Sequence, residues 1–218
     1  MADQLVPTVK TPVTPVGFAR ALLKVWPEAT REACGVLYAQ YAVETGAGAA
    51  CWNWNLGNVK YTRGWGGDYV ALVRNREYDE KTQSYYETAK ADPSSWFRAY
   101  PSFEAGMRAF VLSKTTGQWK STKPFIERGD HAGYSAELKR LRYYTAPLDA
   151  YQAGMRTWFG RWMKMGAWEE AVEPGETMPP PPPSSAPVTL ESPRRDPTRA
   201  PGFSNLDYDP DAPPDDVA

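Results

Sequence analysis

The sequence predicts a mainly α-helical domain with a small inserted β-hairpin and a long C-terminal tail. Apolar residues recur at helical spacing on both sides of the middle of the chain, the middle alternates weakly as short strands do, and most prolines gather at the C-terminal end. A chain of 218 residues with 42% hydrophobic residues can bury one core. We therefore expect a flexible N-terminal arm over residues 1–15, one domain over residues 16–172 and a disordered tail over residues 173–218.

Two helices are expected at the start of the domain. The stretch "VGFARALLKVW" places its apolar residues on one face of a helix. Pro27 ends this helix and suits the first turn of the next one, which we expect over about residues 28–45. Gly46 follows as a C-terminal stop signal.

The middle of the chain has the features of a small hairpin. The stretches "DYVALV" and "WFRAY" alternate as short strands do, and "RNREYDEKTQSYYE" between them is polar with aromatic interruptions. A hairpin inserted into a helical domain accounts for all three segments.

Helical spacing returns after the hairpin. The stretches "SFEAGMRAFVLSK" and "SAELKRLRYY" each carry apolar residues on one side. A last helix is expected over about residues 148–170. Aromatic residues at helical spacing are more typical of a core than of a ligand site. The buried side of this helix is expected to carry Tyr151, Met155, Trp158, Phe159 and Trp162.

The tail differs from the rest of the chain in composition. Residues 173–218 hold 13 of the 21 prolines and carry 9 acidic against 3 basic residues, a net charge of −6, whereas residues 1–172 have a net charge of +5. Such a segment buries too little apolar surface to fold alone. Its stretch "PGFSNLDYDP", which sets aromatic and aliphatic residues among acids, is a candidate for docking on a protein partner.

The composition argues against several classes of function. A net charge of +5 on the body suits an anionic surface such as a cell wall but is too small to indicate nucleic acid. The chain contains no stretch of roughly 18 apolar residues and opens on no secretory leader, so we expect cytoplasmic synthesis and no contact with a membrane. His131, the single histidine, stands in the polar stretch "RGDHAG", is expected in a surface loop and predicts no metal site. Cys34 and Cys51 are expected to be unpaired buried thiols, and one bridge between them is the alternative.

A single carboxylate, Glu44, stands at the end of the apolar helix expected over residues 28–45. The negative end of the helix dipole and burial beside Trp52 or Trp54 would both disfavour the charged form and raise the pKa of Glu44. A carboxyl group that stays protonated near neutral pH can act as a general acid in glycoside cleavage. The alternative is a surface glutamate in a fraying last turn.

The segment that follows this helix favours a sugar site. The stretch "WNWNLGNVK" brings two indoles and three amides within a few residues of one another. Flat aromatic rings cover the faces of sugars, and amides pair with hydroxyl and acetamido groups. The residues expected to bind substrate are Trp52, Trp54, Asn55 and Asn58.

In combination, "AQYAVETGAG", "WNWNLGNVK", "WFRAYPSFEAGMRAFV" and "YYTAPLDAYQAGM" resemble the glucosaminidase branch of the lysozyme-like superfamily, which includes flagellar peptidoglycan hydrolases and phage lysins. The resemblance covers roughly residues 16–156. It implies a lysozyme-like helical domain in which Glu44 is the general acid and the turn over residues 55–58 forms the floor of the cleft. It also implies that Tyr143 or Tyr144 reaches toward the site. We favour Tyr144 as the catalytic tyrosine and expect Tyr143 to bind substrate.

The resemblance further implies a second acidic residue on the hairpin, which activates water or stabilises the transition state. We favour Glu77 for this role, and the other acidic residues of the hairpin are Asp79, Glu80 and Glu87. A separation of roughly 5 Å between the two carboxyl groups would imply retention, and one of roughly 6.5–9.5 Å would imply inversion. Without a close second carboxylate, catalysis through the substrate acetamido group or a lytic transglycosylase reaction would need only one protein acid.

The sequence thus predicts an enzyme that hydrolyses β-1,4 glycosidic bonds of bacterial peptidoglycan, of the endo-β-N-acetylglucosaminidase type, without a metal or cofactor. We expect it to act at the cell wall as a phage-type or effector-type lysin, released by lysis, by a phage particle or by an injection system. A muramidase or lytic transglycosylase is the alternative within enzymes. From another class, the alternative is a non-catalytic wall-binding or phage structural protein.

Overall fold

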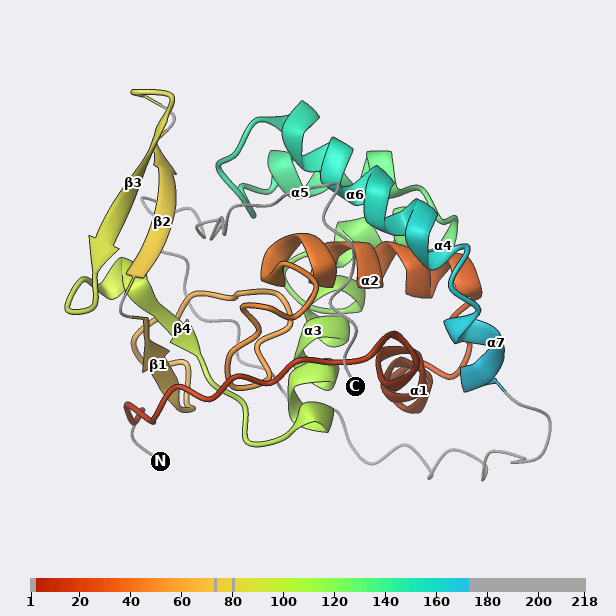
Figure 1. Ribbon diagram of the computed structural model, residues 1–218, viewed down its shortest axis with the longest axis horizontal. Helices are drawn as coiled ribbons and strands as arrows, with labels where there is room; N and C mark the ends of the chain where they lie inside the picture. Colours follow the sequence, from red (N-terminus) through yellow and green to blue (C-terminus); the bar gives the residue numbers. More distant parts are fainter. Residues whose placement is uncertain (1–2, 73, 80, 173–218) are drawn as a thin grey trace.

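The computed structural model describes residues 3–72, 74–79 and 81–172, and Figure 1 shows their arrangement. Within these residues the chain forms seven α-helices and two small two-stranded sheets, which confirms the predicted mainly α class with an inserted hairpin. The tail and its candidate docking stretch lie outside the described residues. No helix among the described residues is both long and apolar enough to cross a membrane.

Helix α2 (Arg31–Thr45) forms the centre of the core, and α1, α4 and α6 pack against it. The side chain of Thr30 accepts a hydrogen bond from the N–H of Ala33, and the helix ends at Gly46 in the left-handed conformation, with φ of 56°. The expected start next to Pro27 is therefore wrong by a few residues, because Thr30 supplies the N-terminal cap. The helix is apolar on nearly every side, and almost all of its side chains are buried.

The other helices surround α2. Helix α1 contacts α3 and α7, and α5 contacts α4 and α6. Two 3-10 helices are also present: η1 (Pro93–Ser95) precedes the strand Trp96–Arg98, and η2 (Lys120–Thr122) connects α3 to α4. The bounds of the remaining helices are α1 (Pro15–Val25), α3 (Phe103–Thr115), α4 (Lys123–Glu127), α5 (His131–Arg140), α6 (Leu148–Trp162) and α7 (Ala167–Ala171).

The helix expected over residues 148–170 is two helices, α6 and α7. Gly166 adopts a φ of 68° between them, which breaks the helical backbone. The aromatic side of α6 does belong to the core, as predicted: Trp158 and Trp162 are buried, and Phe159 packs against the core.

The strands form two separate antiparallel pairs. Strand β1 (Tyr69–Ala71) pairs with β4 (Trp96–Arg98), and β2 (Arg74–Asp79) pairs with β3 (Ser84–Ala89). The β2–β3 hairpin projects from the domain at the upper left of Figure 1, while the β1–β4 pair lies closer to the helices. The predicted hairpin region therefore contains a sheet at its base and a hairpin above it.

Residues 3–14, expected to be a flexible arm, lie along the domain. The N–H of Val6 donates to the carbonyl of Tyr69, and the N–H of Thr11 donates to the carbonyl of Cys51, both at 2.9 Å. The segment runs across the lower part of Figure 1 from the β1–β4 sheet to α1. Its extended backbone leaves N–H and C=O groups free to pair with the domain, and these bonds hold it there.

The expectations for the two cysteines and for His131 have different outcomes. Cys34 and Cys51 are both buried and unpaired, as predicted. His131 does not lie in a surface loop: it begins α5, is half-buried, and its ring centroid lies 5.0 Å from that of Phe159. The cap of α5 comes from Asp130, whose side chain accepts the N–H of Gly133.

Helix α3 crosses very close to the turn that carries Trp54. A Cβ atom added at Gly106 would lie 2.1 Å from the carbonyl oxygen of Trp54. The ring of Trp54 packs beside Phe103 one turn earlier in α3, with 5.4 Å between the ring centroids. Glycine at position 106 therefore permits the close approach of α3 to this turn.

We expect Gly106→Ala to lower the free energy of unfolding by about 2–4 kcal/mol, because backbone or helix must shift to admit the methyl group. Urea unfolding would measure the change. Gly160→Ala in α6 is a matched control, since nothing lies within 4 Å of a Cβ atom there, and it should be neutral or stabilising by up to about 1 kcal/mol. Equal stability of Gly106→Ala and the wild-type protein would contradict the close approach.

Candidate active site

Glu44 lies in the last turn of α2, and the protein encloses its carboxyl group. The residue keeps only 2% of its surface exposed. From α6, the hydroxyl of Tyr151 donates a hydrogen bond to Oε1 of Glu44 at 3.0 Å. The alternative of a surface glutamate in a fraying turn is therefore wrong, because α6 packs over the end of α2.

Burial controls the protonation of this carboxyl group. Loss of water around Glu44 raises its pKa to about 8, and the hydrogen bond from Tyr151 and the charges of Lys114 and Lys60 oppose the shift. The group is consequently protonated at neutral pH. The expected direction of the pKa shift is correct, and desolvation is its largest cause.

The amides of the 55–58 turn bind backbone groups. Asn55 donates through Nδ2 to the carbonyls of Val59 (2.9 Å) and Arg98 (3.0 Å), and its Oδ1 accepts the N–H of Val59 at 2.8 Å. Asn58 donates through Nδ2 to the backbone carbonyl of Glu44. Both side chains are buried, where a polar group needs a partner. They fasten the turn to β4 and to the end of α2.

The two tryptophans predicted to bind substrate, Trp52 and Trp54, are half-buried. Trp52 pairs through its backbone with Lys10 of the N-terminal segment. Trp54 lines a pocket of about 270 Å³ together with Asn53 and Tyr100, and Glu44 is not among the residues lining it. Trp54 therefore lies at a pocket, and the binding of substrate by Trp52 and Trp54 remains a prediction.

Tyr151 is the tyrosine whose hydroxyl bonds to Glu44, and the predicted roles of Tyr144 and Tyr143 at the site remain predictions. Tyr143 is buried and donates its hydroxyl to the carbonyl of Gly57 at 2.6 Å. The hydroxyl of Tyr144 donates to the carbonyl of Ser135 at 3.0 Å, and its ring stacks on that of Tyr151, with centroids 3.8 Å apart and planes 7° from parallel. The stacked ring of Tyr144 thus helps to hold the ring of Tyr151 in place. Sequence reasoning placed Tyr151 in the core of the last helix and missed its contact with Glu44.

A buried lysine, Lys114 of α3, is a second residue that the sequence reasoning missed. Its side chain has no exposed surface. The ammonium group donates to the carbonyl of Phe110 at 3.2 Å and lies 3.9 Å from the centroid of the Phe110 ring, with Trp119 and Tyr143 further out at 5.3 and 5.6 Å. Burial lowers its pKa to about 7, and the charge of Glu44 opposes this shift. Lys114 and Glu44 therefore influence each other's protonation.

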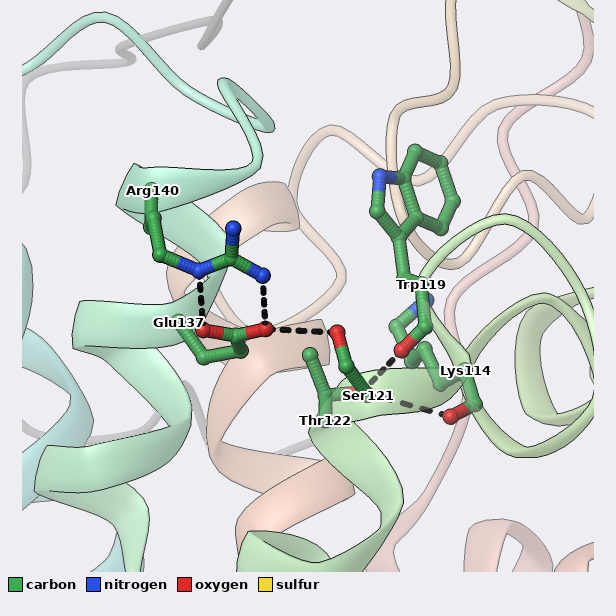
Figure 2. A network of polar contacts seen from close by, with 6 residues as sticks. All are labelled: Lys114, Trp119, Ser121, Thr122, Glu137 and Arg140. Atoms are coloured by element: carbon green, nitrogen blue, oxygen red, sulfur yellow. Dashed lines mark hydrogen bonds and ion pairs between the residues drawn. The ribbon is translucent and has the colours of Figure 1, made fainter.

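The segment after Lys114 is held by polar contacts that Figure 2 shows. The hydroxyl of Thr122 bonds to the carbonyl oxygens of Lys114 (3.2 Å) and Trp119 (2.7 Å). Next to it, Ser121 donates to Glu137 of α5 at 2.5 Å, and Arg140 binds the same carboxylate. These contacts fix Trp119 beside the lysine.

The acidic residues of the hairpin are spread along it. Glu77 lies in β2 opposite Tyr86, but its side chain and the whole of Glu80 lie outside the described part of the chain. Asp79 accepts the N–H of Lys81 at 2.8 Å, and this bond lowers its pKa. Glu87 is exposed in β3. The choice of Glu77 as the second carboxylate remains a prediction. Among the described residues, no three His, Cys, Asp or Glu side chains gather as they would around a metal ion.

Comparisons with known proteins add one similarity. No protein-family model and no curated protein matches the chain. Among solved structures, the chain is similar to the catalytic domain of the autolysin Auto from Listeria monocytogenes, with 19% identical residues and a TM-score of 0.47. The similarity covers 74% of this chain and 89% of that domain.

The raised pKa of Glu44 predicts a pH-dependent cost in stability. Between the ordinary value of 4.5 and about 8, the folded protein holds a proton that the unfolded chain has lost, so stability falls as pH rises through this window. Glu44→Gln removes the effect. The free energy of unfolding of the variant, relative to the wild-type protein, should therefore rise by up to about 4 kcal/mol from pH 5 to pH 8 in urea unfolding experiments.

Glu137→Gln is the control for this measurement. The hydrogen bond from Arg140 lowers the pKa of Glu137. Its contribution to stability therefore changes only in the acid range, and the difference between this variant and the wild-type protein should be flat from pH 5 to pH 8. A flat difference for Glu44→Gln as well would contradict the buried, protonated carboxyl group.

Tyr151→Phe should raise the pKa of Glu44 further, because the hydrogen bond from Tyr151 favours the ionised form. Titration of the glutamate side-chain carbons by NMR would show the shift. Tyr134→Phe is a matched control: it also deletes a buried hydroxyl, which bonds Oε1 of Gln40 at 2.5 Å and not Glu44. A shift of equal size in both variants would mean that the contact between Tyr151 and Glu44 has no special effect.

Proposed function

We propose that the protein is a peptidoglycan hydrolase that cleaves β-1,4 glycosidic bonds of the glycan strand with Glu44 as the general acid. The observation that carries this proposal is a buried carboxyl group that keeps its proton at neutral pH and is oriented by a tyrosine hydroxyl. Cleavage of a glycosidic bond needs a proton on the leaving oxygen, and a carboxyl group with a raised pKa supplies it.

The neighbours of Glu44 suit this chemistry. The hydrogen bond of Tyr151 to Oε1 orients the carboxyl group and would leave Oε2 to carry the transferable proton. After the transfer, a carboxylate would be left in a buried site, where an uncompensated charge is costly. Lys114, whose pKa lies near 7, can become cationic as Glu44 loses its proton. Its positive charge would then stabilise the carboxylate.

Substrate must come into contact with a carboxyl group that is 2% exposed. The described conformation is therefore a closed one, and binding of the glycan has to displace side chains that cover Glu44. Glycosidases commonly close around substrate, which excludes water from the reacting atoms.

A carboxylate of the hairpin is proposed to carry out the second half of the reaction. Glu77 of β2 would activate water or stabilise the oxocarbenium-like transition state. Within this proposal we favour the endo-β-N-acetylglucosaminidase type. A muramidase shares the proton donor but cuts the alternate linkage, and a lytic transglycosylase needs Glu44 alone.

The small exposed fraction of Glu44 also favours a second candidate function, that of a non-catalytic protein. A wall-binding or particle-structural protein could keep a buried glutamate without turnover, because the residue would then serve only the fold. This candidate predicts binding to peptidoglycan without release of fragments.

Digestion of purified sacculi, followed by mass spectrometry of the new chain ends, tests these candidates. We expect new N-acetylglucosamine reducing ends, and muramic or anhydro ends would indicate the alternative enzymes. Glu44→Gln should lower the rate about 10³-fold, since the amide cannot donate the required proton. Glu127→Gln, which changes the exposed ion pair with Lys123 in α4, is the control and should keep full activity. Release of no ends by the wild-type protein would favour the non-catalytic candidate.

A further inference from the structure

Three aromatic rings cluster on one face of the β1–β4 sheet. Tyr61 stacks on Tyr69, with ring centroids 4.2 Å apart and planes 25° from parallel, and Trp96 lies 5.2 Å from Tyr69. Each of the three residues is partly exposed, and together with Arg63 they line a cavity of about 520 Å³. We call Tyr61, Tyr69 and Trp96 the aromatic platform.

Polar contacts hold the aromatic platform in place. Asp3 accepts three hydrogen bonds through its carboxylate: from the hydroxyl of Tyr61 at 2.8 Å, from the N–H of Gly64 at 2.7 Å and from the N–H of Gly66 at 3.1 Å. The indole N–H of Trp96 donates to the carbonyl of Lys90 at 3.0 Å. Because these contacts order the rings and the adjoining loop in advance, a ligand would bind without the cost of ordering them.

The aromatic platform faces away from the proposed active site. Side chains alternate between the two faces of a sheet. Val70 and Phe97 are buried on the inner face, where the ammonium group of Lys60 lies 3.9 Å from the centroid of the Phe97 ring and its charge acts on Glu44. Tyr69 and Trp96, one residue along each strand, belong to the opposite face.

We infer that the aromatic platform is a second binding site for a glycan strand of N-acetylated sugars, separate from Glu44. Partly exposed, pre-ordered rings cover the apolar faces of pyranose sugars. Arg63, which also lines the cavity, can donate to a sugar hydroxyl or to the carbonyl oxygen of an acetamido group. The cavity volume falls within the roughly 300–1,000 Å³ of ligand sites.

The choice of glycan as ligand rests on the proposed function. A second site on the same domain would hold the protein on the wall and raise the local concentration of glycan near Glu44. The aromatic platform would therefore act mainly on insoluble substrate, where one strand or its neighbour can occupy both faces.

Sedimentation with purified sacculi tests this inference. The full chain with Glu44→Gln is used so that the wall is not digested, and the sacculi are stripped of anionic wall polymers. Adding Trp96→Ala should weaken the apparent Kd about tenfold, and adding Arg63→Ala about threefold. Adding Tyr86→Ala is the control, because Tyr86 is a 50% exposed tyrosine of β3 outside the aromatic platform, and it should leave the Kd unchanged.

Circular dichroism of each variant verifies the fold. If Trp96→Ala does not fold, the Kd of Arg63→Ala, a change of an exposed side chain, tests the inference alone. The inference is overturned if the folded variants bind within twofold of the Glu44→Gln protein. Binding only to unstripped sacculi would also overturn it, since the ligand would then be an anionic polymer.

The two proposals fail in different measurements. Release of no chain ends by the wild-type protein, together with a weaker Kd for Trp96→Ala, would contradict the hydrolase and support the aromatic platform. Digestion of sacculi with unchanged Kd values would contradict the aromatic platform alone.

Discussion

The contact between Glu44 and Tyr151 is the interaction on which the proposed chemistry depends. A carboxyl group can be buried at moderate cost only in its neutral form, and here the packing of α6 over the end of α2 provides both the burial and the hydrogen-bond donor. The ring of Tyr144 stacks on Tyr151 and limits its movement. The same packing that completes the core therefore determines the protonation and orientation of the carboxyl group.

The turn after α2 extends this arrangement to the β region. Gly46 ends the helix, and Asn58 binds the carbonyl of Glu44 while Asn55 binds β4. The two asparagines predicted to bind substrate thus connect the helices with the β1–β4 sheet. Lys114 approaches from α3, and its burial among aromatic rings makes its charge responsive to the state of Glu44.

Much of the fold could be predicted from the sequence, because periodic apolar residues identify most of the helices directly. Glu44 stood out as the one charge after Glu32 in an otherwise apolar helix that is followed by helix-stop residues. Tyr151 and Lys114 could not be identified in this way. A tyrosine on the apolar side of a helix looks like any core residue, and a lysine in an amphipathic helix usually lies in water. Only the packing of α6 on α2, and the burial of Lys114 where its charge acts on Glu44, reveal that both residues interact with Glu44.

The boundaries that were predicted incorrectly have local causes of the same kind. Thr30 competes with Pro27 as the helix start, and Gly166 breaks a pattern whose apolar spacing continues past it. The pairing of β1 with β4 could not be predicted from the sequence either, because two three-residue strands contain too few side chains to specify a partner.

The N-terminal segment has a mechanical consequence. Its backbone is bonded to β1 at one end, where Val6 and Tyr69 pair, and continues into α1 at the other, with Thr11 bonded to Cys51 between them. Residues 3–14 thus act as a tether that spans the sheet and the helical core. Separating these two parts would break several backbone hydrogen bonds at once. A conformational change that admits a glycan to Glu44 therefore needs the least free energy where it moves segments that the tether does not cross.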